Sequence, residues 1–146
     1  MPDDLPDSPT ARRMITQAPR YLRFVRADVE PVAEDQCRAR VEVQLPEWSS
    51  FVGMSNTVCS PLDTVRAAAE ASLQALTKAI GPKEGLTLSG VEQVQAFGKS
   101  VVLVELMIPF EGESRAVVGV CYAGDNPTRA AALAVLNAAN RSLGTG

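Results

Sequence analysis

The sequence predicts an α+β fold of two layers, built from duplicated βββα units in which one helix covers each antiparallel sheet. Three observations lead to this prediction. Short segments alternate apolar and polar side chains, which is the period of a half-buried strand. Three such segments followed by one helical segment occur twice along the chain. Both helical segments open on a capping residue and a proline, at Ser60-Pro61 and Asn126-Pro127.

The chain has 146 residues, which is the length of a single domain with a sizeable core. Residues 1–18 are rich in Pro, Asp, Ser and Thr, and we expect them to form a flexible N-terminal arm. Residues 19–146 then form a single α+β domain. Within it we expect repeat units at about residues 20–82 and 86–144.

The strands of the first repeat are predicted from alternation. Between residues 37 and 48, Ala39, Val41, Val43 and Leu45 share one face, and arginine, glutamate and glutamine side chains share the other. This pattern indicates a strand with one face in a core and one in water. The expected strand segments of this repeat are residues 20–32, 37–48 and 49–58.

The helix of the first repeat is predicted by a change of period. From residue 61 the apolar residues recur at spacings of three and four, so we expect an amphipathic helix over residues 61–80. Gly81 supplies its C-terminal cap, and Pro82 prevents its continuation.

The second repeat has the same order of elements. Sliding the chain on itself by about 63 residues pairs Gln74 with Asn137 and Gly81 with Gly144. Its strands are expected at residues 86–97, 99–110 and 113–124, and its helix at residues 126–144.

The second helix is apolar on all sides between residues 130 and 136. Such a helix must be buried on more than one side, and one sheet in a two-layer domain covers only one. A second subunit is the simplest additional cover. We therefore expect a homodimer.

Charge and residue usage exclude several classes of function. The net charge is −3, which disfavours nucleic acid and anionic membranes as partners. Histidine is absent, which removes imidazole metal ligands and Ser-His or Cys-His pairs. The N-terminus has no signal-peptide core, and no segment has the length of a membrane span. We expect a cytoplasmic protein with no metal, no cofactor and no membrane partner.

The cysteines, at positions 37, 59 and 121, are odd in number and far apart. This spacing predicts neither a zinc site nor a disulfide framework, so we expect reduced thiols. Cys59 directly precedes the Ser60 cap, where a helix N-terminus lowers a thiol pKa. Because the chain has no histidine base, a nucleophilic Cys59 is not favoured. Cys37 and Cys121 are interpreted as small packing groups within strands.

The two helix starts differ in charge. After the Ser60 cap, Asp63 stands at the third helical position, where it satisfies the exposed amides and the helix dipole. Asn126 repeats the cap, but no acid follows at the third position. The second start is therefore the better candidate for accepting a carboxylate or phosphate.

Two motifs carry a resemblance to a known family. Residues 55–68, SNTVCSPLDTVRAA, are similar to a GNGPVDAL type of turn, and residues 119–143, GVCYAGDNPTRAAALAVLNAANRSL, are similar to a final strand and helix. Both resemble the C-terminal regulatory, dimer-forming domain of 2-isopropylmalate synthases and related citramalate synthases. The resemblance covers about residues 20–144. It departs from the family where Thr57 to Ser60 replace turn glycines.

The resemblance implies a regulatory module without catalysis. Domains of that family pair with a twin and bind an end-product amino acid where helix starts approach one another. By this resemblance, the ligand of the present chain is an amino acid or a related small carboxylate. The positions that would face it are Asn56, Thr57, Ser60, Pro61, Asp63, Gly119, Gly124, Asp125 and Asn126.

Two other functions are open from the sequence. Residues 61–143 run α-β-β-β-α, the topology of double-stranded RNA-binding domains, and residues 12–26 interleave arginines with Tyr21 and Phe24. Such domains carry a lysine cluster at the last helix, where this chain has only Arg129. An enzyme would use Glu105 as a buried acid, with Asp63 or Asp125 as its partner.

Overall fold

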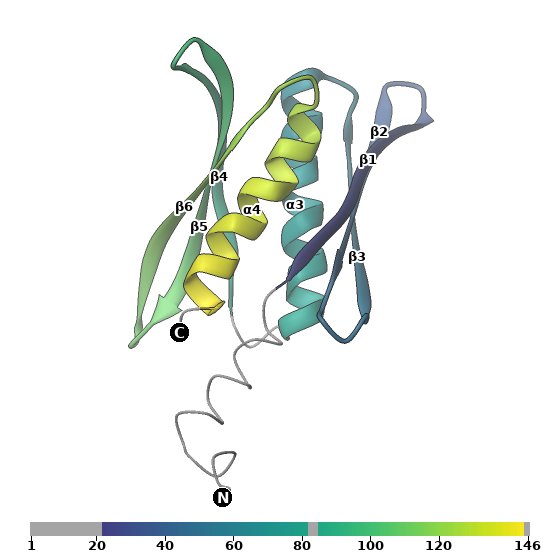
Figure 1. Cartoon of the computed structure of the whole chain (residues 1–146). Coiled ribbons are helices and arrows are strands. Elements are labelled where there is room, and N and C mark those ends of the chain that lie inside the picture. The colour runs from purple at the N-terminus through teal and green to yellow at the C-terminus, as the bar shows by residue number, and fades with distance from the viewer. Residues whose placement is uncertain (1–21, 82–84, 145–146) are drawn as a thin grey trace, which may run out of the picture.

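The computed structural model of the chain describes residues 22–81 and 85–144, and it consists of two βββα units (Figure 1). The predicted order of elements is confirmed. The predicted arm at residues 1–18 and Pro82 lie outside the described residues. The first unit contains β1 (Arg23–Ala33), β2 (Gln36–Gln44), β3 (Ser50–Val58) and α3 (Pro61–Ile80). The second contains β4 (Thr87–Ala96), β5 (Lys99–Phe110), β6 (Glu113–Tyr122) and α4 (Pro127–Gly144).

Each unit is a two-layer structure of one antiparallel sheet and one helix, as predicted. The strand orders are β1-β2-β3 and β4-β5-β6. The helix α3 packs on β2 and β3, while α4 packs on β5 and β6, and the two helices contact each other. Figure 1 shows both helices between the two sheets. The units therefore meet helix to helix, and their shared core lies along this contact.

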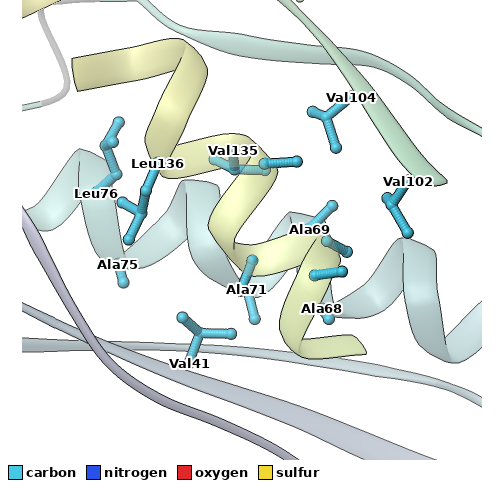
Figure 2. Packing of buried hydrophobic residues seen from close by; sticks show 14 of the residues in the cluster. Val41, Ala68, Ala69, Ala71, Ala75, Leu76, Val102, Val104, Val135 and Leu136 are labelled. Carbon is cyan, nitrogen blue, oxygen red and sulfur yellow. The ribbon is translucent and has the colours of Figure 1, made fainter. Parts of the chain in front are cut away.

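Small side chains allow the two helices to approach closely (Figure 2). Alanines dominate the buried face of both helices, and valines from β2 and β5 pack around them. The single buried polar side chain of the described core, Ser72, donates a hydrogen bond to the backbone carbonyl of Ala132 at 3.1 Å. This bond satisfies the hydroxyl and joins α3 to α4.

One glycine in each unit lets the helix touch the third strand. A Cβ placed on Gly53 in β3 would lie 1.9 Å from the carbonyl oxygen of Ala71 in α3. A Cβ placed on Gly119 in β6 would lie 1.9 Å from the carbonyl oxygen of Ala134 in α4. Only a residue without a side chain fits at such a backbone contact.

Polar side chains near the end of α3 bind the free edge of β3. The backbone N–H of Met54 donates to Gln74 Oε1 at 2.9 Å, and Lys78 Nζ donates to the carbonyl of Val52 at 2.7 Å. Since β3 is an edge strand, these bonds use backbone groups that have no neighbouring strand.

The second unit repeats this arrangement. Asn137 Nδ2 donates to the carbonyl of Val120 at 3.2 Å, and Arg141 donates to the carbonyl of Val118. Asn137 follows Gln74 by 63 positions, as the sequence predicts, whereas Val120 follows Met54 by 66. In the second unit, the helix residue that binds the third strand therefore lies three residues, or nearly one turn, closer to the start of its helix.

The structure corrects the argument for a second subunit. The helix α4 is buried within one chain, because α3, β5, β6 and β1 all contact it. From the sequence we expected only the second sheet to cover α4 within one chain. The packing of the first unit against α4 was not predicted. Asn140 also holds β1 against α4, since its side chain accepts from the N–H of Leu22 and donates to its carbonyl.

The two sheets present outer faces of opposite character. Side chains alternate across a sheet, so the strand register assigns each residue to a face. The outer face of the first sheet carries Arg38, Arg40, Glu42 and Gln44 on β2, and an Arg26–Glu42 ion pair of 3.5 Å joins β1 to β2. The outer face of the second sheet is mainly apolar. It carries Val94, Val101, Leu103, Met107, Val118, Val120 and Tyr122.

Candidate functional site

The start of α3 is capped as predicted. The Ser60 hydroxyl accepts from the backbone N–H of Asp63 at 3.2 Å and donates to Asp63 Oδ2 at 2.7 Å. The carbonyl of Ser60 accepts the first helical bond from Thr64 at 2.9 Å. Pro61, which has no N–H, stands at the first turn. The local sequence therefore supplies a hydrogen-bond acceptor for one exposed backbone amide and places a negative charge at the positive end of the helix dipole.

The start of α4 is capped in the same way but has the opposite charge. Asn126 Oδ1 accepts from the backbone N–H of Arg129 at 3.0 Å and from the Thr128 hydroxyl at 2.7 Å. The Arg129 guanidinium lies 5.2 Å from the centre of the Phe24 ring on β1. Where α3 has the Asp63 carboxylate, α4 has a cation. The dipole and the guanidinium both favour an anion at this start.

Both helix starts lie at the same end of the molecule, at the top of Figure 1. The end of β3, with Asn56 and Thr57, leads into one start, and Gly124 and Asp125 lead into the other. Gly124 has a φ of 56°, the left-handed conformation that favours glycine in this turn. The Asn56 side chain accepts from Arg38 Nε at 3.0 Å. Eight of the nine expected ligand-facing residues thus lie in the two strand-to-helix turns at this end or in the strand and helix ends that flank them.

Gly119 is the exception. It lies in the middle of β6, where it faces the backbone of α4. Its lack of a side chain is explained by the close helix contact described above.

Cys59 is bonded to Cys37, so the prediction of reduced thiols is wrong for this pair. The register of β2 and β3 pairs Cys37 with Thr57, and Cys59 follows just beyond the strand end. The hairpin thereby brings two cysteines, 22 positions apart, to a Cα–Cα distance of 5.1 Å. The spacing of the cysteines in the sequence does not predict this strand register, so it does not predict the disulfide.

Cys121 is a free thiol on β6. Burial raises the pKa of this thiol, and the nearby Arg129 guanidinium opposes the shift in part. The thiol is therefore protonated at neutral pH, in keeping with a packing role.

A hollow of about 330 Å³ lies beside α3 and the second sheet, and its lining includes residues of the outer face together with Val91 and Val104 of the core face. Glu105, the acid singled out in the sequence, lines it together with Glu92 of β4 and Arg66 of α3. Neither of the expected acid partners, Asp63 and Asp125, is among its lining residues. A partial signal is visible in the sequence, since Glu105 interrupts the apolar run of β5, but the sequence does not reveal that Glu92 and Glu105 share a hollow.

Two further observations bear on the kind of site. In residues 22–81 and 85–144, no three His, Cys, Asp or Glu side chains come together in a way that could hold a metal ion. None of the helices in the described part of the chain is both long and apolar enough to cross a membrane.

Comparison with known proteins adds no family to these observations. No protein-family model matches the chain, and no curated protein is significantly similar to it in sequence.

Proposed function

We propose that this chain is a non-catalytic regulatory module that binds a small carboxylate or an amino acid at its two helix starts. The observation that carries the proposal is that two proline-led, capped helix starts lie at the same end of the molecule (Figure 1). The resemblance to the regulatory domain of isopropylmalate synthases supports the same function.

The two starts offer complementary charges to an amino acid. The carboxylate is bound at the start of α4, where the helix dipole and Arg129 attract an anion. The ammonium group is attracted by the carboxylates of Asp63 and Asp125. A simple carboxylate uses only the first of these interactions.

A thermal-shift assay with branched-chain amino acids and 2-oxo acids at millimolar concentration tests this function. A binding ligand raises the melting temperature by mass action. We expect Arg129→Gln to abolish the shift. Arg115→Gln is the matched control, because Arg115 also lies over an aromatic ring, at 4.8 Å from that of Phe110. Flat melting curves across the set, or equal loss in both variants, would contradict the proposal.

We also propose that the chain pairs with a second copy, although α4 no longer requires it. Val120 and Tyr122 on β6 are 49% and 56% exposed, and they form part of the apolar outer face of the second sheet. Exposed apolar patches mark interaction surfaces. Sedimentation velocity across a hundredfold range of concentration tests the pairing. A single species of monomer mass throughout would refute it.

A cytoplasmic location stays part of the proposal, and the disulfide supplies its test. Disulfides are rare in the reducing cytoplasm. Cells expressing the chain can be quenched in acid and alkylated to trap the thiol state. Modified Cys37 and Cys59 would support the location, and a protected pair would contradict it.

RNA binding gains no specific support. Arg26 is paired with Glu42 at 3.5 Å, and Arg23 hydrogen-bonds to Gln44 at 2.5 Å and stacks on Trp48. These two arginines of the basic segment therefore have partners within the protein.

A further inference from the structure

We propose that the hollow beside the second sheet binds an organic ammonium cation with an aliphatic body. This site is separate from the helix starts, and the proposal does not depend on the function proposed above. The hollow has a volume of about 330 Å³ and is lined by apolar side chains, two carboxylates and one guanidinium.

The hollow is open because Gly90, which lies beside Glu105, has no side chain. Gly90 on β4 is the register partner of Glu105 on β5, directly after an irregularity that shifts the register between Leu88 and Gly90. A Cβ placed on Gly90 would meet no atom within 4 Å. The space beside Glu105 is therefore open, and Leu103 and Val118 supply apolar walls for an aliphatic chain.

The unbalanced charge of the hollow is negative. Within residues 22–81 and 85–144, Glu92 and Glu105 form no hydrogen bond or ion pair. Arg66 is paired with Glu70 on its own helix at 3.8 Å. Its charge is therefore partly compensated, while the two carboxylates are not.

The positions of the two carboxylates suit one ammonium group. Glu92 is the register partner of Leu103, so Glu92 and Glu105 are diagonal neighbours on the same face of the sheet. Diagonal neighbours lie roughly 7–8 Å apart, within the joint reach of two glutamates around a shared cation. A metal ion would need more oxygen ligands, and the lining supplies only these two acids. An ammonium group can donate hydrogen bonds to both carboxylates, while its alkyl chain covers Leu103 and Val118.

Titration of the full chain with hexylammonium, followed by NMR chemical shifts, tests the site. Hexanol and hexanoate are the ligand controls. We expect hexylammonium to bind and both controls to bind much more weakly. Glu105→Gln and Glu92→Gln should each weaken binding about fivefold, the upper range for a partly exposed ion pair. Glu113→Gln removes the same charge at the beginning of β6, outside the hollow lining, and should have no effect.

Substitution of Arg66 shows whether the bound ligand is a cation or carries a negative charge. If the ligand is a cation, Arg66→Gln removes a repulsive charge and should strengthen binding about twofold. If Arg66→Gln weakens binding, the ligand is an anion or a zwitterion, and the proposal is wrong. Gly90→Leu should fill the hollow and abolish binding while the circular dichroism spectrum stays unchanged. Undiminished binding by folded Gly90→Leu, or hexanoate binding as tight as that of hexylammonium, would also overturn the proposal.

Discussion

Replacing Gly119 with alanine should destabilise the protein more than any other single added methyl group in the second sheet. The new Cβ would lie 1.9 Å from the carbonyl oxygen of Ala134, and ordinary contacts begin at 3.4 Å. The backbone of α4 must therefore move by about 1.5 Å, the difference between these distances. The atom in the way belongs to the main chain, so no rotamer change relieves the clash.

The cost follows from what this movement disturbs. Asn137 and Arg141 bind β6 on either side of Gly119, and the opposite face of α4 packs on α3. Overpacking of a core costs about 1–3 kcal/mol, and a backbone clash belongs at the upper end of this range, at about 3 kcal/mol. Against a total stability of about 5–15 kcal/mol, this loss is large.

Urea denaturation followed by circular dichroism measures the effect. Gly90→Ala is the matched control, because a Cβ at Gly90 meets nothing within 4 Å. It should leave the midpoint unchanged or raise it slightly, since glycine weakens a strand relative to alanine by about 0.5–1 kcal/mol. Adding Ala134→Gly to the Gly119→Ala chain should not restore stability, because the clash is with the Ala134 carbonyl. Equal midpoints for Gly119→Ala and Gly90→Ala, at equal slope, would refute the reasoning.

Three further predictions concern local interactions. Reduction of the Cys37–Cys59 disulfide, which closes a loop of 22 positions, should lower stability by about 3 kcal/mol, and melting with and without dithiothreitol will show a lower midpoint under reduction. Ser60→Ala and Asn126→Ala each remove a helix cap and should cost about 1 kcal/mol in urea denaturation; a change below a few tenths would show that the cap is dispensable. The pKa of the Cys121 thiol is raised in the folded state, so its contribution to stability is present below the unfolded pKa and is lost as pH rises through the folded pKa. The stability difference between wild type and Cys121→Ala should therefore shrink from pH 7 to pH 10, and a constant difference would contradict this origin.

Local patterns in the sequence predict the elements and their ends. The alternation at residues 39–45 identifies a strand in any surroundings, and Ser60 and Asn126 act on amides only three residues away. The sequence repeat likewise reappears in space, because Gln74 and Asn137 each bind the backbone of their third strand, Gln74 as an acceptor and Asn137 as a donor. Each of these features depends on interactions that are short-range or contained within one unit.

Features that depend on register or on packing between units were missed. Cys37 meets Cys59 only because the hairpin pairs Cys37 with Thr57. The additional cover of α4 comes from α3 and β1 of the other unit, and the pattern within a single unit does not predict it. The hollow at Glu105 requires the irregularity before Gly90, since an unbroken ladder would give Glu105 a different partner. In each case the deciding contact joins residues whose alignment is set by the whole sheet.

The first sheet has a charged outer face and the second sheet has an apolar one, and this difference has a consequence for a duplicated architecture. If two identical half-length chains assembled into this shape, every substitution on one exterior would appear on the other as well. Joining the halves in one polypeptide removes that constraint. The outer face of the first sheet can then keep its arginines and glutamates, while the outer face of the second sheet carries valines and a tyrosine.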